Sequence, residues 1–362
     1  MIDLSFLDNK IILITGHTGF KGRWLVRLLD KLCNAKLMGV APKDIFFQES
    51  RVFFENIDID EIFFDISDFK KVDDLIRKVS PDVIIHLGAQ SLVNDAITNP
   101  LKTFSSNILG TANILSASGS LDKKIMFLNI TSDKVYKNSE NLDPFTESSE
   151  LGGLDPYSCS KSCAELISHS FFDTYVNKLK LSKLSIANLR AGNVIGGGDF
   201  GLNRIIPDIH RTIKLGEKLQ LRMPYAIRPW QHVLDCLSGY LHALSHIASF
   251  EECVSIDFNV GPQNFEKVTV LDICEHAKKW FPMLIYELNS AVVAESEFLL
   301  LDSKLLSETT GWSPLYNTHE AIDQTFKWYH SFENGHDASA LINKEVTDYL
   351  TNNRSFKKAV TI

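Results

Sequence analysis

The fold of this chain is decided by residues 11–22, Ile-Ile-Leu-Ile-Thr-Gly-His-Thr-Gly-Phe-Lys-Gly. The apolar run at 11–14 is typical of a strand buried on both faces of a sheet. Apolar residues then recur at helical spacing through residues 20–32, so a helix follows the strand directly. Glycines at 16, 19 and 22 let the backbone turn sharply and approach a pyrophosphate, whose charge suits a helix N-terminus. The segment therefore predicts a dinucleotide-binding turn, with an ordinary tight turn as the alternative.

Strands and helices alternate through the rest of the N-terminal half. Further strands are predicted at residues 36–40, 61–65, 83–87, 125–130 and 184–189. Further helices are predicted between them, at residues 68–79, 100–118 and 157–175. Repeated β-α-β order indicates an α/β fold, with a doubly wound parallel sheet of the Rossmann type covered by helices on both faces.

The pattern changes after Arg190, where glycines and prolines mark loops. Short strands are mixed there with shorter helices, predicted at residues 204–214, 230–246, 270–280 and 319–329. We expect a dinucleotide-binding domain at 1–190, to which about 230–262 returns. Residues 191–229 and 263–350 should form a smaller, discontinuous α+β substrate lobe. The polar stretch 351–362 is expected to be a flexible tail.

Composition excludes several classes of function. The 362 residues are 44% hydrophobic and 23% charged, which is ordinary for a globular protein. A net charge of -8 argues against a general nucleic-acid binder, which needs a concentrated positive face. No apolar run reaches the roughly 18 residues of a membrane helix, and the N-terminus lacks a secretory signal. We therefore expect a cytoplasmic protein without a membrane partner.

The six cysteines stand at 33, 159, 163, 236, 253 and 274, and they include no Cys-x-x-Cys. Free thiols and no metal site are the expectation.

Tyr157 and Lys161 lie one turn apart on a predicted helix and so share a face. A lysine cation beside a phenol favours the phenolate, which lowers the tyrosine pKa from about 10 toward neutrality. Such a phenolate can take a hydroxyl proton while a nicotinamide takes the hydride. A solvated helix face is the alternative for this spacing.

Three polar residues, Ser132, Asp133 and Lys134, follow the predicted strand at 125–130. Ligands of doubly wound sheets bind at the carboxyl edge of the strands. Ser132 could hydrogen-bond a reacting hydroxyl, and the adjacent Asp and Lys could serve as acid and base. A surface loop with a salt-bridged pair is the alternative.

The end of the second strand, Gly39 to Lys43, offers neither the expected acidic ribose contact nor an arginine for a 2′-phosphate. This position therefore leaves NAD and NADP open. Asp65 and Ile66, after the third strand, could flank the adenine, although Asp65 could equally cap a helix.

Together these motifs resemble the extended short-chain dehydrogenase/reductase superfamily, and within it the CDP-glucose 4,6-dehydratase family. The resemblance runs from about residue 7 to about residue 350. It is carried by residues 16–22, Thr131-Ser132-Asp133-Lys134, Asp155-Pro156-Tyr157-Ser158, residues 190–199 and residues 227–233. Most sugar-nucleotide 4,6-dehydratases carry Asp-Glu at the position of Asp133-Lys134, and a lysine there is characteristic of the CDP-glucose branch.

The resemblance implies a role for each matching catalytic residue. Tyr157 would deprotonate the sugar 4-hydroxyl while carbon 4 gives its hydride to NAD, and Ser132 would bind the 4-oxygen. Lys161 would hold the cofactor ribose and lower the Tyr157 pKa. Lys134 would take the carbon 5 proton, and Asp133 would protonate the departing 6-hydroxyl. The hydride would return to carbon 6, giving a CDP-4-keto-6-deoxy-hexose for deoxysugar and surface polysaccharide biosynthesis, as in lipopolysaccharide O-antigen.

The resemblance also implies the binding residues. NAD would be held by Gly16, Thr18, Gly19, Phe20, Gly22, Asp65, Ile66, Leu87, Ala89, Tyr157 and Lys161. The CDP-hexose would be held by Gln90, Asn193, Arg204, Arg228, Gln231 and Asn259. Arginines suit a diphosphate because guanidinium forks pair with phosphate oxygens. A homodimer through the helices at about 100–118 and 157–175 is implied as well.

Residues 91–97 depart from the family pattern by lacking a basic pair and a Ser-Tyr, which leaves the identity of the hexose open. Another nucleotide-sugar 4,6-dehydratase or a 4-epimerase of the superfamily is the nearest alternative. A catalytically silent dinucleotide-binding regulator is a more distant one, and it should lack the Tyr, Lys and Ser set.

Overall fold

The computed structural model describes residues 2–43, 51–137, 143–263, 266–289 and 298–356. Its main body is a parallel sheet of seven strands in the order β10-β6-β5-β4-β1-β2-β3. The strands are β1 Ile11–Thr15, β2 Lys36–Ala41, β3 Ile59–Phe63, β4 Val83–His86, β5 Ile125–Ile130, β6 Leu184–Ala191 and β10 Ser255–Val260. This is the doubly wound Rossmann-type topology expected from the sequence. Strands β1 to β3 extend the sheet to one side and β4 onward extend it to the other, so the strand order reverses between β1 and β4.

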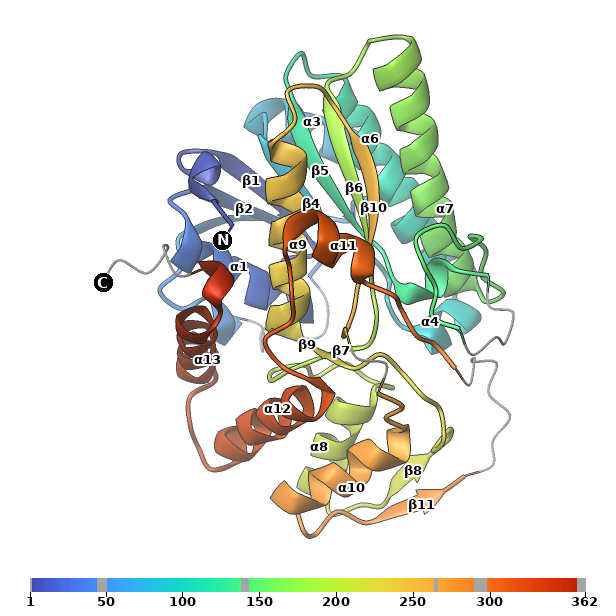
Figure 1. Cartoon of the computed structure of the whole chain (residues 1–362), viewed down its shortest axis with the longest axis vertical. Coiled ribbons are helices and arrows are strands. Elements are labelled where there is room, and N and C mark those ends of the chain that lie inside the picture. The colour runs from blue at the N-terminus through green and yellow to red at the C-terminus, as the bar shows by residue number, and fades with distance from the viewer. Residues whose placement is uncertain (1, 44–50, 138–142, 264–265, 290–297, 357–362) are drawn as a thin grey trace.

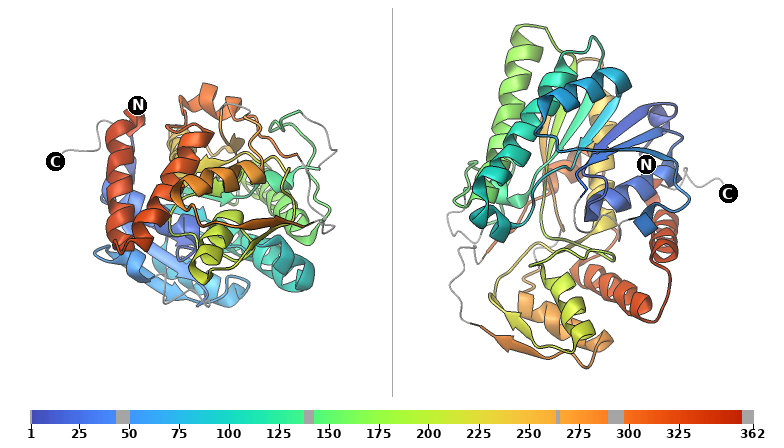
Figure 2. Two further views of the ribbon diagram at one scale, coloured as in Figure 1. Left: turned by 90° about the horizontal axis from the view of Figure 1, so that it is seen from below. Right: turned by 180° about the vertical axis from the view of Figure 1, so that it is seen from behind.

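Alternate residues of the central strands lie in two different cores, which is why β1 and β4 are almost wholly apolar. Ile12 and Ile14 of β1 face one core, whereas Leu13 faces the other. The first core is covered by α1 Phe20–Leu32 and α9 Val233–Ala248. The second is covered by α3 Phe69–Val79, α6 Gly110–Gly119 and α7 Pro156–Phe171, as Figure 2 shows from behind.

The predicted elements agree with the structure except at particular points. The helix expected at 100–118 contains a π-helical turn Ser105–Leu109 between α5 Pro100–Phe104 and α6, and the one at 157–175 ends in a π-helical turn Phe172–Lys178. The third strand ends at Phe63, so Asp65 lies two residues beyond it. Three helices were not anticipated: α4 Val93–Thr98, α11 Lys304–Thr310 and α13 Ala338–Asn352.

A smaller lobe lies beyond the carboxyl ends of the strands, at the bottom of Figure 1. It contains α8 Ile205–Leu215, α10 Val270–Trp280 and α12 Thr318–Glu333, with the strand pair β8 Leu219–Leu221 and β11 Tyr286–Leu288. The pair β7 Val194–Ile195 and β9 Gln231–His232 joins the lobe to the sheet. Residues 233–260 then return to the sheet as α9 and β10.

The C-terminal segment differs from the expected tail. Helix α13 packs against α1 and the 3-10 turn η2 Arg51–Phe54, so it lies on the sheet domain rather than in the substrate lobe. The expectation of a flexible tail from 351 is wrong for residues 351–356, because α13 continues to Asn352 and the turn Arg354–Phe356 buries Phe356. Apolar spacing in α13 outweighs the polar character of its end. Residues 357–362 lie outside the described part.

Candidate active site

A cavity of about 360 Å³ opens at the carboxyl ends of the strands, between the sheet domain and the small lobe. It is lined by residues that come from distant parts of the chain, among them Phe20, Lys21, Ser132, Asp133, Lys134, Tyr157, Asn193, Arg204 and Arg228. The parallel sheet brings them together because all its strands end at the same edge.

In the glycine turn between β1 and α1, neighbouring backbone segments lie too close for side chains. Gly16 has φ +72°, and a Cβ on it would lie 2.9 Å from Gly88 Cα after β4. A Cβ on Gly22 would lie 2.4 Å from the Gly16 carbonyl oxygen, so α1 begins directly against the turn. Gly19 caps α1 without any side-chain hydrogen bond, and the first turn carries no acidic residue. The amides of this helix start therefore fit the pyrophosphate of a dinucleotide.

His17, inside the glycine turn, is a feature that the sequence did not reveal. Its ring is buried against Gly39, where any side chain would collide with it. Its Nε2 lies 2.8 Å from Glu61 Oε1, which also accepts a hydrogen bond of 2.6 Å from Arg51 Nη1. Burial lowers the His17 pKa despite the carboxylate. The acidic group next to β2 thus comes from β3, where Glu61 pairs with Gly39, and only the sheet register reveals it.

The other predicted cofactor residues lie after β3, after β4 and in the glycine turn itself. Asp65 is exposed and accepts a hydrogen bond from the Ser67 amide at 2.9 Å, whereas Ile66 is buried. Asp68, not Asp65, caps α3. Leu87 and Ala89 are half-buried after β4, on either side of Gly88. Thr18 is buried in the glycine turn.

Tyr157 and Lys161 both lie on the buried face of α7, as their spacing predicts. The N-cap Asp155 accepts hydrogen bonds from the amides of Tyr157 and Ser158, at 2.9 and 3.0 Å, which fixes the start of the helix. Lys161 Nζ donates a hydrogen bond to the Ile130 carbonyl at 3.0 Å. The lysine is thereby anchored to the end of β5, next to Ser132.

The expected lowering of the Tyr157 pKa is not found, because burial acts in the opposite direction. Burial raises the pKa of Tyr157 to about 12, although a hydrogen bond with Ser132 acts in the opposite direction. Burial, and then the charge of Lys21, lowers the pKa of Lys161 to about 7. Both shifts have one physical cause, since a dry site disfavours every charged form.

After β5, Ser132 is the N-cap of a 3-10 turn, Asp133–Val135, which contains Asp133 and Lys134. Ser132 Oγ donates to Asp133 Oδ1 at 2.9 Å and accepts from the Lys134 amide at 3.1 Å. Asp133 is only 4% exposed, and burial raises its pKa. Within the described ranges its Oδ2 has no hydrogen-bond partner. The alternative of an exposed loop is therefore wrong, because these side chains face the cavity.

The six predicted substrate residues divide into two groups. Asn193, Arg204 and Arg228 line the cavity. Arg204 is held by Asp199 Oδ2 at 2.9 Å and by Ser91 Oγ at 2.9 Å. Ser91 belongs to the segment that departs from the family pattern, so this departure reaches the cavity wall.

The other three, Gln90, Gln231 and Asn259, are not among the residues that line this cavity. The Gln90 side chain bonds with both backbone groups of Leu92, and Gln231 Nε2 donates to the Val260 carbonyl at 2.6 Å. Asn259 Nδ2 donates to the Phe145 and Asp302 carbonyls. In the structure these amides hydrogen-bond to backbone groups of the chain.

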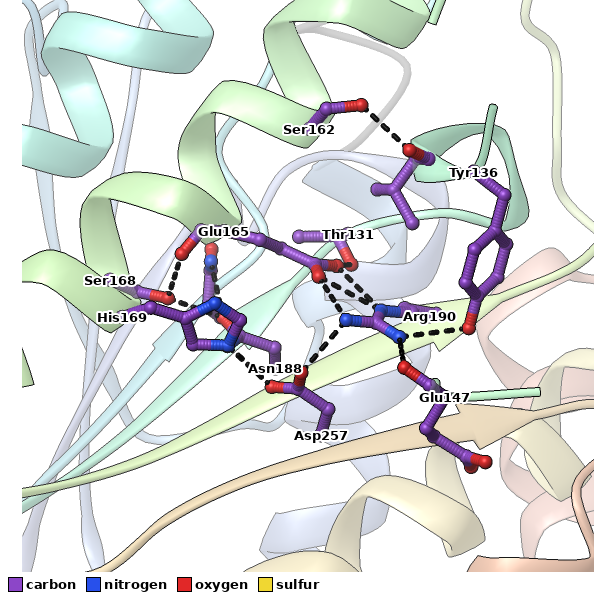
Figure 3. Close-up of polar contacts among 12 residues, drawn as sticks. Thr131, Tyr136, Glu147, Ser162, Glu165, Ser168, His169, Asn188, Arg190 and Asp257 are labelled. Atoms are coloured by element: carbon purple, nitrogen blue, oxygen red, sulfur yellow. Dashed lines mark hydrogen bonds and ion pairs between the residues drawn. The ribbon is translucent and has the colours of Figure 1, made fainter. Parts of the chain in front are cut away.

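A buried polar network connects the ends of β5 and β6 and strand β10 with helix α7 (Figure 3). Arg190 at the end of β6 forms hydrogen bonds of 2.8 and 2.6 Å with Glu165 Oε2 and one of 2.8 Å with Asp257 Oδ2. Thr131 Oγ1 donates to Glu165 Oε1 at 2.5 Å. Burial opposes the Arg190 charge, but the neighbouring carboxylates raise its pKa further above its usual range. The network ties the residue before Ser132 to the helix that carries Lys161.

The described residues lack two further features. No helix among them is both long and apolar enough to cross a membrane. No group of three or more His, Cys, Asp or Glu side chains there could hold a metal ion.

Comparisons with known proteins agree with this geometry. The model of the NAD dependent epimerase/dehydratase family matches residues 12–261. CDP-glucose 4,6-dehydratase of Salmonella typhimurium is 34% identical, over 97% of this chain and 99% of its own length. The dTDP-glucose 4,6-dehydratase of the same strain is 27% identical, over 88% of this chain and 92% of its own length. In fold, the chain is similar to the UDP-glucose 4-epimerase of Thermotoga maritima, with a TM-score of 0.76 and 20% identity over 89% of this chain and 99% of that one.

Proposed function

Because the chain belongs to the NAD dependent epimerase/dehydratase family, its cofactor is NAD, and we propose that it dehydrates a CDP-hexose, most simply CDP-glucose. The product is a CDP-4-keto-6-deoxy-hexose. Identity of 34% over nearly the full length of a CDP-glucose 4,6-dehydratase supports this choice, as does the Asp133-Lys134 pair. Such a product serves deoxysugar synthesis for surface polysaccharides such as the lipopolysaccharide O-antigen.

The observation that carries the proposal is the burial of the Asp133 carboxyl in the wall of the cavity. Burial raises the pKa of the Asp133 carboxyl and so favours its protonated form, and its Oδ2 has no hydrogen-bond partner among the described residues. A protonated carboxyl facing a cavity is suited to protonating a leaving hydroxyl. An epimerase or a simple dehydrogenase has no leaving hydroxyl to protonate.

The first step oxidises carbon 4 of the sugar. NAD supplies the acceptor for the carbon 4 hydride and later returns that hydride to carbon 6. Tyr157 takes the proton of the 4-hydroxyl, and Ser132 holds the oxygen. The Tyr157 pKa of about 12 must fall for this step. Lys161, whose pKa is about 7, favours the phenolate when it is protonated.

The second step eliminates water. The new 4-ketone acidifies the carbon 5 proton, which Lys134 takes while the bond between carbon 6 and oxygen breaks. Asp133 gives its proton to the departing hydroxyl, so water leaves and a double bond joins carbons 5 and 6. The returning hydride then enters at carbon 6, and Lys134 returns a proton to carbon 5. The proton that Tyr157 keeps balances the one lost by Asp133.

Isotope labels test this sequence against a 4-epimerase. In heavy water the wild-type product should carry deuterium at carbon 5, and deuterium placed on carbon 4 should reappear at carbon 6. Lys134→Met should lose both signals but still bind NAD. Tyr157→Phe should bind NAD and lose turnover by ~10²–10⁴-fold. If the label returns to carbon 4 without exchange at carbon 5, the protein is an epimerase.

The nucleotide is tested separately by offering CDP-, dTDP- and UDP-glucose and measuring kcat/KM for each. Arg204 and Arg228 line the cavity and are proposed to bind the diphosphate, which all three substrates share. Preference for CDP-glucose supports the proposal. Equal or better turnover of another nucleotide would assign the dehydratase to that nucleotide.

We also propose a homodimer through α5, α6, α7 and their π-helical turns. These helices expose apolar side chains that the folded chain leaves uncovered: Leu101, Leu109, Leu166 and Tyr175. A shallow cavity on the same face is lined by Ile108, Cys163 and Leu166, among others. Sedimentation should show a dimer that Leu166→Glu weakens, whereas Leu154→Glu, at an exposed loop position, should not.

A further inference from the structure

Helix α7 carries a third residue on the face that presents Tyr157 and Lys161. Glu165 follows Lys161 by four residues, so the three side chains stand one turn apart along one side of the helix. All three are buried, and Glu165 is completely so. The proposed mechanism uses the tyrosine and the lysine but gives the glutamate no task.

The buried face of α7 is bonded to the end of β5 at two points that lie one turn apart. Lys161 Nζ donates a hydrogen bond to the Ile130 carbonyl at 3.0 Å. Thr131 Oγ1 donates to Glu165 Oε1 at 2.5 Å, and the Thr131 amide donates to the carbonyl of Leu189 on β6 at 2.9 Å. The last residue of the strand and the one after it are therefore both fixed to the helix.

Glu165 is a rigid acceptor for the threonine hydroxyl. Arg190 Nε lies 3.1 Å from Glu165 Oε1 and 2.8 Å from Oε2, and Arg190 Nη2 lies 2.6 Å from Oε2. The guanidinium is held in turn by Asp257 Oδ2 of β10 at 2.8 Å (Figure 3). Because its partners come from separate elements, the carboxylate cannot rotate away, and the Thr131 hydroxyl is fixed with it.

The residues that the proposed reaction uses follow Thr131 directly. Ser132 comes next in the chain, and its hydroxyl forms a hydrogen bond with the phenol of Tyr157. In the proposed oxidation the sugar 4-hydroxyl must meet both of these groups at once. A shift of the strand end by about 1 Å would disturb that arrangement, and a misplacement of this size can cost about a hundredfold in rate.

We propose that Glu165 and Thr131 are positioning residues, which fix Ser132 relative to Tyr157 and thereby set the rate at which carbon 4 of the sugar gives up its hydride. This inference rests on the proposed function, since it takes the roles of Ser132 and Tyr157 from the proposed reaction. Glu165 is not among the residues that line the cavity, so it acts through Thr131, which does line it. The Tyr-x-x-x-Lys spacing thus continues by one turn, to Tyr-x-x-x-Lys-x-x-x-Glu.

The test is Thr131→Val, which keeps the branched shape of the side chain and removes its hydroxyl. The full chain is mixed with saturating NAD and the glucose nucleotide that it turns over best, and the absorbance of reduced nicotinamide follows hydride uptake before the steady state. The rate should fall ~10–100-fold, whereas KM and the NAD dissociation constant should not change. Deuterium at carbon 4 should slow kcat more in the variant than in the wild type, because hydride transfer then limits turnover.

Two further variants separate position from packing. Thr131→Ser restores a donor for Glu165 and should recover most of the rate. Thr131→Ala lacks the hydroxyl as well and gives the same readout should the valine variant fold poorly. Thr325→Val is the matched control, because Thr325 is completely buried on α12, donates to the Ala321 carbonyl at 2.8 Å and is not among the cavity-lining residues. It should lose a similar amount of stability toward urea and keep the wild-type rate.

Three results would overturn the inference. Wild-type hydride uptake in Thr131→Val would show that the hydroxyl positions nothing. A raised KM with an unchanged rate of uptake would show that Thr131 binds the substrate itself. Equal losses of rate in Thr131→Val and Thr325→Val would assign the effect to general stability.

These results are distinct from a failure of the proposed function. Hydride uptake from carbon 4 is common to a 4,6-dehydratase and a 4-epimerase, so the test holds for either outcome of the isotope experiment. A wild-type protein that reduces no nicotinamide with CDP-, dTDP- or UDP-glucose would reject the proposed function, and the inference with it.

Discussion

Ser132 Oγ donates a hydrogen bond of 2.9 Å to Oδ1 of Asp133, a residue that lines the cavity, and Oδ2 of the same carboxyl has no partner among the described residues. The serine can therefore hold the carboxyl in place while the other oxygen carries the proton. This relationship links the residue proposed for the oxidation step with the residue proposed for elimination.

Asp133→Asn should separate these two steps. The amide keeps the size and the hydrogen bond of the carboxyl but has no acidic proton to give, so elimination should fall by ~10²–10⁴-fold. Oxidation of carbon 4 should continue, and mixing the variant with CDP-glucose and NAD should produce the absorbance of reduced nicotinamide. Tyr157→Phe should produce neither product nor absorbance. Wild-type turnover in Asp133→Asn would remove the aspartate from the mechanism.

Arg228→Met should raise KM for the sugar nucleotide by roughly ten- to a hundredfold, because a charge-assisted contact contributes ~1.5–3 kcal/mol. The NAD dissociation constant should not change. Arg204→Met should likewise raise KM for the sugar nucleotide without changing the NAD dissociation constant. It should also disorder the cavity wall more, because Arg204 joins Asp199 to Ser91. Arg211→Met is the control, since Arg211 pairs with Asp208 and is not among the cavity-lining residues. Unchanged KM in both cavity variants would place the diphosphate elsewhere.

Lys161→Met should make the protein more stable near neutral pH. The folded pKa of Lys161 is about 7, against 10.5 for an ordinary lysine. Between these values the unfolded chain holds the proton and the folded protein does not, so wild-type stability from this group rises with pH. Below about 7 the folded protein bears the full cost of a buried cation, at about 1.4 kcal/mol for each pKa unit.

Urea unfolding at a series of pH values measures this effect. The stability advantage of Lys161→Met should be largest at and below pH 7 and should narrow as the pH rises above it. Lys31→Met should show no comparable trend, because Lys31 is exposed. An advantage that stays constant or grows with pH would contradict the lowered pKa.

Arg190→Met should destabilise the fold strongly. Removal of the guanidinium leaves the buried Glu165 carboxylate without its main partner, and breaking such a pair costs ~3–5 kcal/mol. Lys137→Met is the control, since its exposed pair with Glu150 should contribute less than ~1 kcal/mol. The free energy of unfolding from denaturant curves compares the two, and similar small losses would mean that the network in Figure 3 does little for stability.

The sequence alone predicted the Rossmann-type sheet, because local periodicity determines which residues can form a buried strand or an amphipathic helix. Residues 11–14 are apolar at every position and became a central strand, and the helix predicted at 20–32 has the same bounds in the structure. Tyr157 and Lys161 were predictable for the same reason, since a one-turn spacing on a helix is a local property. The resemblance to a family then supplied the roles that spacing could not.

Only the tertiary structure decided which polar groups meet. Glu61 reaches His17 because the sheet register places it beside Gly39, and Arg190 meets Glu165 and Asp257 from three separate elements. The amides of Gln231 and Asn259 match a binding motif, yet packing turns them toward backbone carbonyls. The pKa values of Tyr157 and Lys161 likewise depend on burial, which is a sum over neighbours distant in the chain and leaves no periodic trace in the sequence.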